Sequence, residues 1–116
     1  MTLQETIDAV RQWGVDRGIT GPEGKGTLLG QLSKSQEELT ETRDAAVEWG
    51  MTDFNEPGHE AVQAELADGL GDTFVTLILA AEMAGLRIED CLTAAYDEIK
   101  GRTGSMVGGQ FKKDTP

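Results

Sequence analysis

Two clusters of acidic residues in the middle of the chain have the spacing of a single helix face. Glu38 and Glu41 occur in SQEELTE, and Glu65, Asp68 and Asp72 occur in AELADGLGD about 24 residues later. At about 100° per residue, the members of each cluster point to the same side of a helix. Mg²⁺ prefers oxygen ligands and retains several waters. The two clusters together therefore predict a divalent-cation site supplied by two helices.

The residues after Asp72 give this cluster more weight than spacing alone. They read TFVTLILAA, which is apolar almost all round and predicts a buried helix. Asp72 is therefore expected at the edge of a core or inside it, where a carboxylate is costly unless it is paired or metal-bound. Residues 57–84 contain no Lys or Arg. The alternative interpretation is that both clusters are solvated helix faces.

Three further residues near the acidic clusters have two interpretations each. Gly69 and Gly71 each cost a helix interior about 1 kcal/mol relative to Ala, so they indicate either close approach of a neighbouring helix or ligand, or a kink. Lys34 stands one turn before Glu38 and is expected either to contact a phosphate or to pair with that glutamate.

Net charge limits the class of partner. The chain carries −11, and the 6 Lys/Arg and 20 Asp/Glu of residues 1–99 give −14, whereas the 4 Lys/Arg and 1 Asp/Glu of residues 100–116 give +3. An acidic body argues against a nucleic-acid duplex as partner, because phosphate neutralisation supplies most of that affinity. The basic tail is suited to a small anion.

Neither the single histidine nor the single cysteine is expected to do chemistry. His59 falls in a predicted connector and is expected to be exposed. Without repeated Glu-x-x-His pairs, a di-iron or di-manganese bundle is unlikely chemistry for this chain. Cys91 is expected to be a buried small hydrophobe rather than a nucleophile.

The element pattern predicts four helices. Thr2 with Glu5 forms a capping-box pattern, Thr27 is a plausible N-cap, and Gly85 a helix stop. Pro57 is tolerated in a first turn. The expected helices cover residues 2–17, 28–49, 57–84 and 88–100.

Apolar periodicity predicts which sides of two helices face a core. The second helix is expected to use Leu28, Leu32, Leu39 and Ala46, and the fourth Leu92, Ala95, Tyr96 and Ile99. After the fourth helix, Gly108-Gly109 separates two short β-capable runs and predicts a hairpin.

The expected fold is all-α: an antiparallel bundle of about four helices with a short C-terminal hairpin or arm. We assign residues 1–103 to the helical domain and 104–116 to the basic arm. The third helix is too apolar for a 116-residue monomer to cover, which favours a homo-oligomer. No apolar run of 18 residues and no signal-peptide pattern occurs, so a soluble cytoplasmic protein without membrane contact is expected.

These residues resemble a known family. QLSKSQEELTE resembles the K-x-x-E-E-x-x-E-L stretch of the MazG-like all-α nucleoside triphosphate pyrophosphohydrolases, whose mark is E-x-x-E followed by E-x-x-D. Here Glu38-x-x-Glu41 precedes Glu65-x-x-Asp68, with 23 residues between them. WGVDRGI, LGDTFVTLILAAEMAGL and IEDCLTAAYDEIKGRTGSMVGGQFKK are also similar to small phage-type members.

The sequence departs from the family pattern at two points. Asp72 fits the family's L-G-D context better than Asp68, and Gly69 then stands where the family has a glutamate, so both aspartates stay candidates. The family's common N-G turn is Gly108-Gly109 here, which keeps the turn chemistry.

The resemblance implies Mg²⁺-dependent hydrolysis of (deoxy)nucleoside triphosphates between the α- and β-phosphates, for nucleotide-pool cleansing or control in a bacterial or phage-infected cell. Mn²⁺ is a possible substitute, and a dimer or tetramer is expected. Either Glu41 or Glu38 would act as general base. Lys100 and Arg102 would contact phosphate, or else simply stabilise a helix C-terminus. The implied metal ligands are Glu38, Glu41, Glu65, Asp68 and Asp72.

Two rival interpretations remain. One is a non-enzymatic acidic helical interaction protein, such as a nucleic-acid mimic or regulator, in which the charge itself is the working feature. The other is an inactive relative that binds nucleotide without cleaving it.

Overall fold

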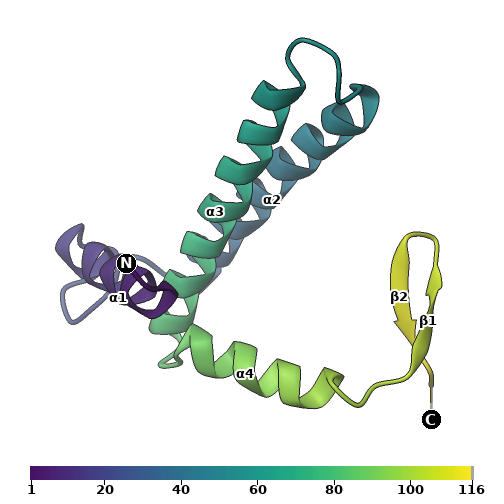
Figure 1. Ribbon diagram of the computed structural model, residues 1–116. Coiled ribbons are helices and arrows are strands. Elements are labelled where there is room, and N and C mark those ends of the chain that lie inside the picture. Colours follow the sequence, from purple (N-terminus) through teal and green to yellow (C-terminus); the bar gives the residue numbers. More distant parts are fainter. Residues whose placement is uncertain (116) are drawn as a thin grey trace. The chain divides into compact units, whose positions relative to one another are not determined.

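The computed structural model describes residues 1–115, which are mostly helical (Figure 1). The chain divides into two units, Met1–Leu86 and the segment from Arg87 onward, upstream of the predicted boundary at 103/104. The predicted four helices and hairpin are confirmed, and residue 116 of the predicted arm lies outside the described part. The elements are α1 (Leu3–Asp16), α2 (Leu28–Met51), α3 (His59–Met83), α4 (Ile88–Ile99), β1 (Gly104–Val107) and β2 (Gln110–Lys113).

The helix ends are set by local chemistry. At α1, the Thr2 hydroxyl accepts from the Glu5 amide at 3.1 Å while the Glu5 carboxylate accepts from the Thr2 amide at 3.2 Å, which is the predicted capping box. At α2, the Thr27 hydroxyl accepts from the Gly30 amide at 3.0 Å. Gly85, with φ of +73°, ends α3 in the left-handed conformation that glycine favours.

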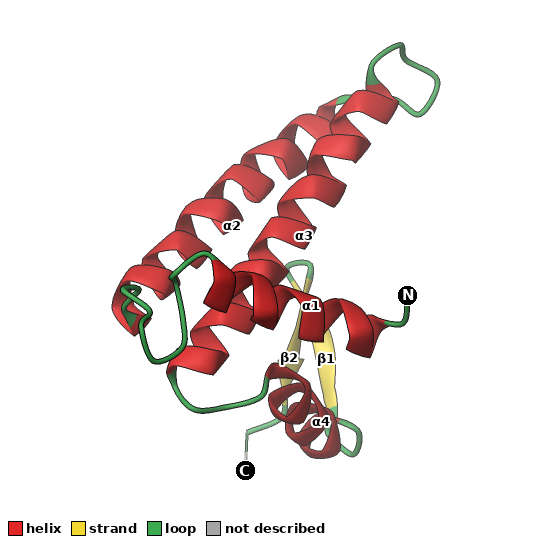
Figure 2. Cartoon of the chain, turned by 90° about the vertical axis from the view of Figure 1, so that its left-hand side faces the viewer, coloured by secondary structure: helices red, strands yellow, loops and turns green. Residues whose placement is uncertain are grey.

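Helices α2 and α3 form an antiparallel hairpin and lie side by side in both ribbon views (Figures 1 and 2). Buried in the seam between them, the Ser35 hydroxyl donates to the Thr76 hydroxyl at 2.7 Å. Seven residues further along α2 and seven back along α3, Thr42 faces Gly69, where an added Cβ would lie 3.1 Å from the threonine Cβ. The seam is therefore built from short, partly polar side chains that let the helices approach closely.

The leucine stripe of α2 does not face this seam. Leu39 is 55% exposed, and Leu28, Leu32 and Ala46 are exposed as well. The prediction that this stripe packs into the core is wrong for the single chain. The physical reason is that a two-helix hairpin offers α2 one inner face, and Ser35, Thr42 and their neighbours at helical spacing occupy it.

The apolar half of α3 forms the core, as predicted. Ile78, Leu79, Ala80 and Ala81 are buried there, together with Ile7 of α1. These contacts hold the C-terminal half of α3 in place.

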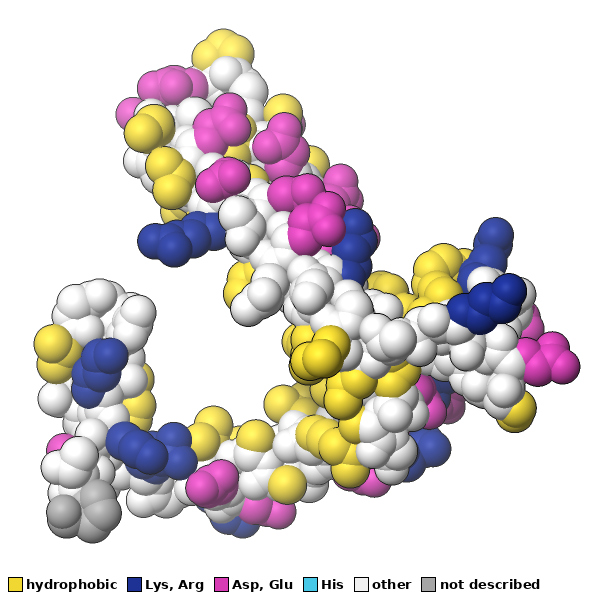
Figure 3. All heavy atoms as spheres, turned by 180° about the vertical axis from the view of Figure 1, so that it is seen from behind, with side chains coloured by type: hydrophobic (Ala, Val, Ile, Leu, Met, Phe, Trp, Pro, Cys, Tyr) yellow, Lys and Arg dark blue, Asp and Glu magenta, His cyan; other side chains and the backbone are white. Residues whose placement is uncertain are grey.

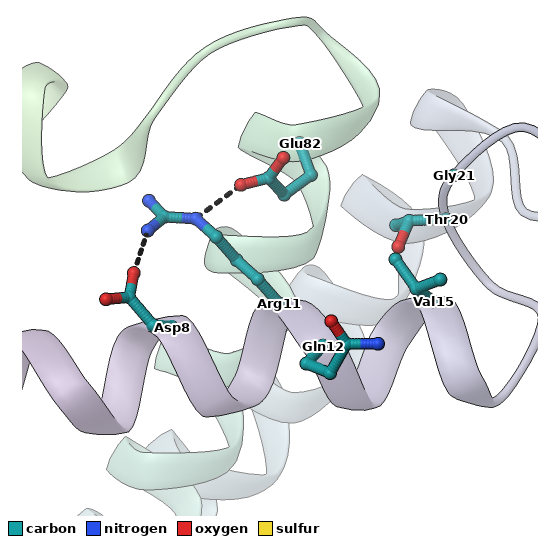
Figure 4. Close-up of a pocket in the computed structure, with 7 residues that line it drawn as sticks. All are labelled: Asp8, Arg11, Gln12, Val15, Thr20, Gly21 and Glu82. Atoms are coloured by element: carbon teal, nitrogen blue, oxygen red, sulfur yellow. Dashed lines mark hydrogen bonds and ion pairs between the residues drawn. The ribbon is translucent and has the colours of Figure 1, made fainter.

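A charged contact docks α1 on α3. Arg11 of α1 is 13% exposed in its side chain and reaches between Asp8, at 2.8 Å, and Glu82 of α3 (Figure 4). A Cβ added to Gly14, one turn further along α1, would lie 2.6 Å from Leu79 Cδ2. Both contacts fix the crossing of α1 over the buried half of α3.

The second unit contains α4 and the hairpin. No residue of α4 is buried, and Leu92, Ala95, Tyr96 and Ile99 are exposed. Their predicted inward position is therefore not seen within their own unit, because the described part of the hairpin does not pack on this apolar face.

Cys91 is also exposed, so its predicted burial is wrong for the same reason. In the hairpin, Met106 pairs with Phe111, and Gly108 and Gly109 take φ of +59° and +80°. Two successive positive φ values are those of a type I′ turn, as the Gly-Gly pair predicts.

Candidate functional site

All five acidic residues predicted as metal ligands line one hollow between α2 and α3, of about 240 Å³. Figure 3 shows Asp and Glu side chains gathered over these two helices. The register of the seam brings the two clusters together across the hairpin. The lining consists of Glu38, Glu41, Thr42 and Ala45 of α2, and Glu65, Asp68, Gly69 and Asp72 of α3.

The carboxylates differ in exposure. The side chain of Glu38 is 16% exposed, whereas Glu41, Glu65 and Asp68 are exposed. Asp72 is exposed too, so of the two positions expected for it, at the edge of the core or inside it, the second is wrong. The reason is position along the helix, since the continuous burial of α3 begins beyond it. Asp72 thus contributes to the hollow from the solvent side.

Lys34 stands one turn before Glu38 on α2. Its Nζ lies 3.4 Å from a carboxylate oxygen of Glu37 and 3.4 Å from one of Glu38, so the expected pairing with Glu38 occurs. The hydrogen bond to Glu37, followed by the two negative charges, raises the pKa of Lys34 above its usual value. Lys34 therefore stays positive at neutral pH.

The two glycines of α3 play different parts. A Cβ on Gly69 would overlap the hydroxyl of Thr42, whereas one on Gly71 meets no atom within 4 Å. Close approach of the neighbouring helix therefore explains Gly69 and does not explain Gly71. Because Gly69 follows Asp68 and lies against Thr42 of α2, the acidic faces are held near each other by backbone proximity.

The composition of the hollow suits a hard divalent cation. Its ligating atoms are carboxylate and hydroxyl oxygens, without nitrogen or sulfur ligands among the lining residues. Within residues 1–115, no three His, Cys, Asp or Glu side chains converge closely enough to hold an ion as they stand. Ion binding therefore requires the exposed carboxylates to turn inward about their side-chain torsions.

Lys100 and Arg102 belong to the second unit, and the hollow is lined from α2 and α3 alone. Lys100 Nζ lies 3.1 Å from Asp97, and Arg102 lies 3.8 Å from Glu98. These are local side-chain ion pairs at the C-terminal end of α4.

A cluster that the sequence analysis missed lies at the tip of the α2–α3 hairpin. His59 is 4% exposed and is the first residue of α3, so its expected exposure in a connector is wrong. Its ring packs 5.6 Å from the Trp49 ring and 4.7 Å from the Phe54 ring, centroid to centroid. The available signal in the sequence was Trp49 just before the connector and Phe54 within it.

The comparisons leave the family open. No family model, curated protein or solved structure matches this chain. In the described part of the chain, no single helix has both the length and the apolar character needed to cross a bilayer.

Proposed function

We propose that this protein is a Mg²⁺-dependent nucleoside triphosphate pyrophosphohydrolase of the MazG-like type. The observation that carries the proposal is that five carboxylates from two helices, selected by motif spacing, line a single hollow. The sequence resemblance and this geometry point to the same residues independently, because motif spacing contains no information on the register between α2 and α3.

The chemistry follows from the carboxylates. A divalent cation, when bound, neutralises triphosphate charge and lowers the pKa of a bound water. Glu38 is held by Lys34 and suits a fixed ligand, whereas the exposed Glu41 is free to turn toward the water and take its proton. The water oxygen bonds to phosphorus as the bond to the bridging oxygen breaks, which yields a monophosphate and pyrophosphate. Lys34, one turn before Glu38 on α2, is the proposed phosphate contact at this hollow.

We also propose a homo-oligomer, a dimer or tetramer, as the working form. Leu29 is 79% exposed and lies with Leu32, Leu39 and Leu77 around an apolar hollow of about 470 Å³ on the α2–α3 hairpin. Contiguous exposed leucines of this kind are typical of protein interfaces. A second copy would cover them.

The test is a pyrophosphate-release assay over the common ribo- and deoxynucleoside triphosphates, with Mg²⁺ and with EDTA. Release is expected with Mg²⁺ only. Glu38→Gln should lower kcat/KM at least about 100-fold, as expected for loss of a metal ligand or general base. The matched control is Glu37→Gln, which removes the neighbouring charge but lies outside the hollow. Release that survives EDTA, or that Glu38→Gln leaves intact, would contradict the proposal.

The acidic interaction protein is the second candidate, and the exposure of most of these carboxylates favours it. Such a protein should bind a basic partner in EDTA and tolerate Glu38→Gln. An inactive relative would instead bind nucleotide in Mg²⁺ without releasing pyrophosphate. The assay, run beside a nucleotide-binding measurement, separates all three.

A further inference from the structure

The tip cluster consists of Trp49, Thr52, Phe54 and His59, and its hydrogen bonds favour one tautomer of the histidine ring. Thr52 Oγ1 lies 3.0 Å from the Trp49 carbonyl oxygen, to which it donates, and 2.9 Å from His59 Nδ1. A hydroxyl has one hydrogen, so when that hydrogen is on the Trp49 carbonyl the hydroxyl accepts from Nδ1–H. In that tautomer the lone pair of the ring lies on Nε2.

Two buried ring nitrogens in the tip cluster lack partners. Neither His59 Nε2 nor Trp49 Nε1 has a hydrogen-bond partner among residues 1–115, and both atoms are buried. One is an acceptor and the other a donor, in rings whose centroids are 5.6 Å apart. Buried polar groups in native proteins are nearly always paired, so this complementary pair points to a missing ligand.

Phe54 lies against the two rings from the connector. Its ring centroid lies 4.7 Å from that of His59, with the planes at 52°, and 6.0 Å from that of Trp49, with the planes at 89°, yet the residue is 74% exposed. An exposed aromatic side chain in a connector can swing away at low cost. Another planar ring can then take its place over the same two rings.

We propose that the tip cluster binds the nucleobase of the nucleotide. The base would take the place of the Phe54 ring, donate an N–H to His59 Nε2 and accept from Trp49 Nε1–H. Nucleobases fit because they are planar aromatic rings that carry a donor beside an acceptor on one edge. The choice of ligand rests on the proposed function.

The distance to the acidic hollow suits one nucleotide. Trp49 is one helical turn beyond Ala45, which lines the hollow, and His59 is six residues before Glu65. At 1.5 Å per residue, six residues span about 9 Å along α3. A nucleotide with its phosphates at the hollow can therefore place its base at the tip cluster.

The test uses Trp49 as its own reporter. The chain has two tryptophans, so Trp13→Phe leaves Trp49 alone. Free nucleosides, titrated without metal, should change Trp49 emission saturably, because they need no phosphate site. Ribose 5-phosphate, which lacks the base, should give no change. Absence of a nucleoside response would overturn the inference.

Two substitutions of His59 separate its nitrogens. His59→Asn keeps a donor near the Nδ1 position for Thr52 and removes the Nε2 acceptor, whereas His59→Gln keeps an acceptor near the Nε2 position. His59→Asn should weaken nucleoside binding about fivefold relative to His59→Gln, as expected for loss of one hydrogen bond. Equal affinities in the two variants would overturn the inference.

Phe54→Ala keeps the test decisive if the His59 variants fail to fold, since Phe54 is mostly exposed. Removing its ring should tighten nucleoside binding, and unchanged or weaker binding would overturn the inference. The outcomes stay separate from those of the proposed function. Pyrophosphate release without a nucleoside response defeats only the inference, whereas a nucleoside response without pyrophosphate release defeats only the enzymatic proposal.

Discussion

Gly69 lies against Thr42 at the acidic hollow and sets how near the two acidic helices come to each other. All three side-chain atoms of Thr42 beyond Cα lie within 3.2 Å of where a Cβ on Gly69 would be. The threonine hydroxyl is also held, because it donates to the Glu38 carbonyl at 2.7 Å. The contact therefore cannot be relieved by turning the hydroxyl alone.

Gly69→Ala is expected to destabilise the protein by about 1–3 kcal/mol, as overpacking does, despite the helix propensity of alanine. Urea unfolding followed by circular dichroism measures it. The control is Gly71→Ala, which has open space and should stabilise by about 0.5–1 kcal/mol. If the two variants behaved alike, the close approach at Gly69 would be disproved.

At the same scale, the sequence predicts the members of the acidic hollow but not the tip cluster. Helical spacing selects Glu38 and Glu65 with their neighbours, because side chains on one helix face are fixed by local geometry. His59 and Trp49 meet only because the helices pair in one register. That register depends on Ser35, Thr76 and Gly69, and no single segment specifies it.

Among the elements, α1 depends on one cation for its docking. Arg11 joins Asp8 of its own helix to Glu82 of α3, and its side chain is mostly buried. Removing the cation would leave two carboxylates near each other. Loss of one partner of a buried ion pair lowers stability more than loss of the whole pair does.

Arg11→Met should therefore lower the free energy of unfolding by about 2–4 kcal/mol, and adding Glu82→Gln should restore part of that loss. Chemical unfolding of the single and double variants measures both. Arg17→Met is the matched control, because that arginine is exposed. A double variant no more stable than Arg11→Met alone would show that the charge contact is not what docks α1.

Element boundaries were largely predictable, whereas the directions of the apolar faces of α2 and α4 were not. The capping groups of Thr2 and Thr27 and the glycine after α3 act within a few residues, so the sequence states them directly. A leucine stripe such as that of α2 has the same sequence pattern whether it packs against its own chain or against another copy. Only the contacts with α3 show that Leu39 lies outside the seam.

For the molecule as a whole, exposed leucines on α2 mean that oligomer formation and stability should be linked. Leu39→Glu should dissociate the proposed oligomer, because it places a charge among apolar side chains that association would bury. Light scattering coupled to size exclusion measures the mass across protein concentrations. Leu3→Glu on α1 is the control, since Leu3 is exposed away from that hollow. A wild-type monomer at all concentrations would contradict the oligomer.

The acidic hollow also means that added salt should stabilise this fold. Carboxylates on facing helices repel one another, and α3 carries no lysine or arginine to offset them. The reach of that repulsion shrinks from about 30 Å at 0.01 M salt to about 10 Å at 0.1 M. Dissolved electrolyte thus strengthens the helical hairpin, whereas a protein held by surface ion pairs is weakened by it. The negative charges that repel one another also attract any cation that enters the hollow.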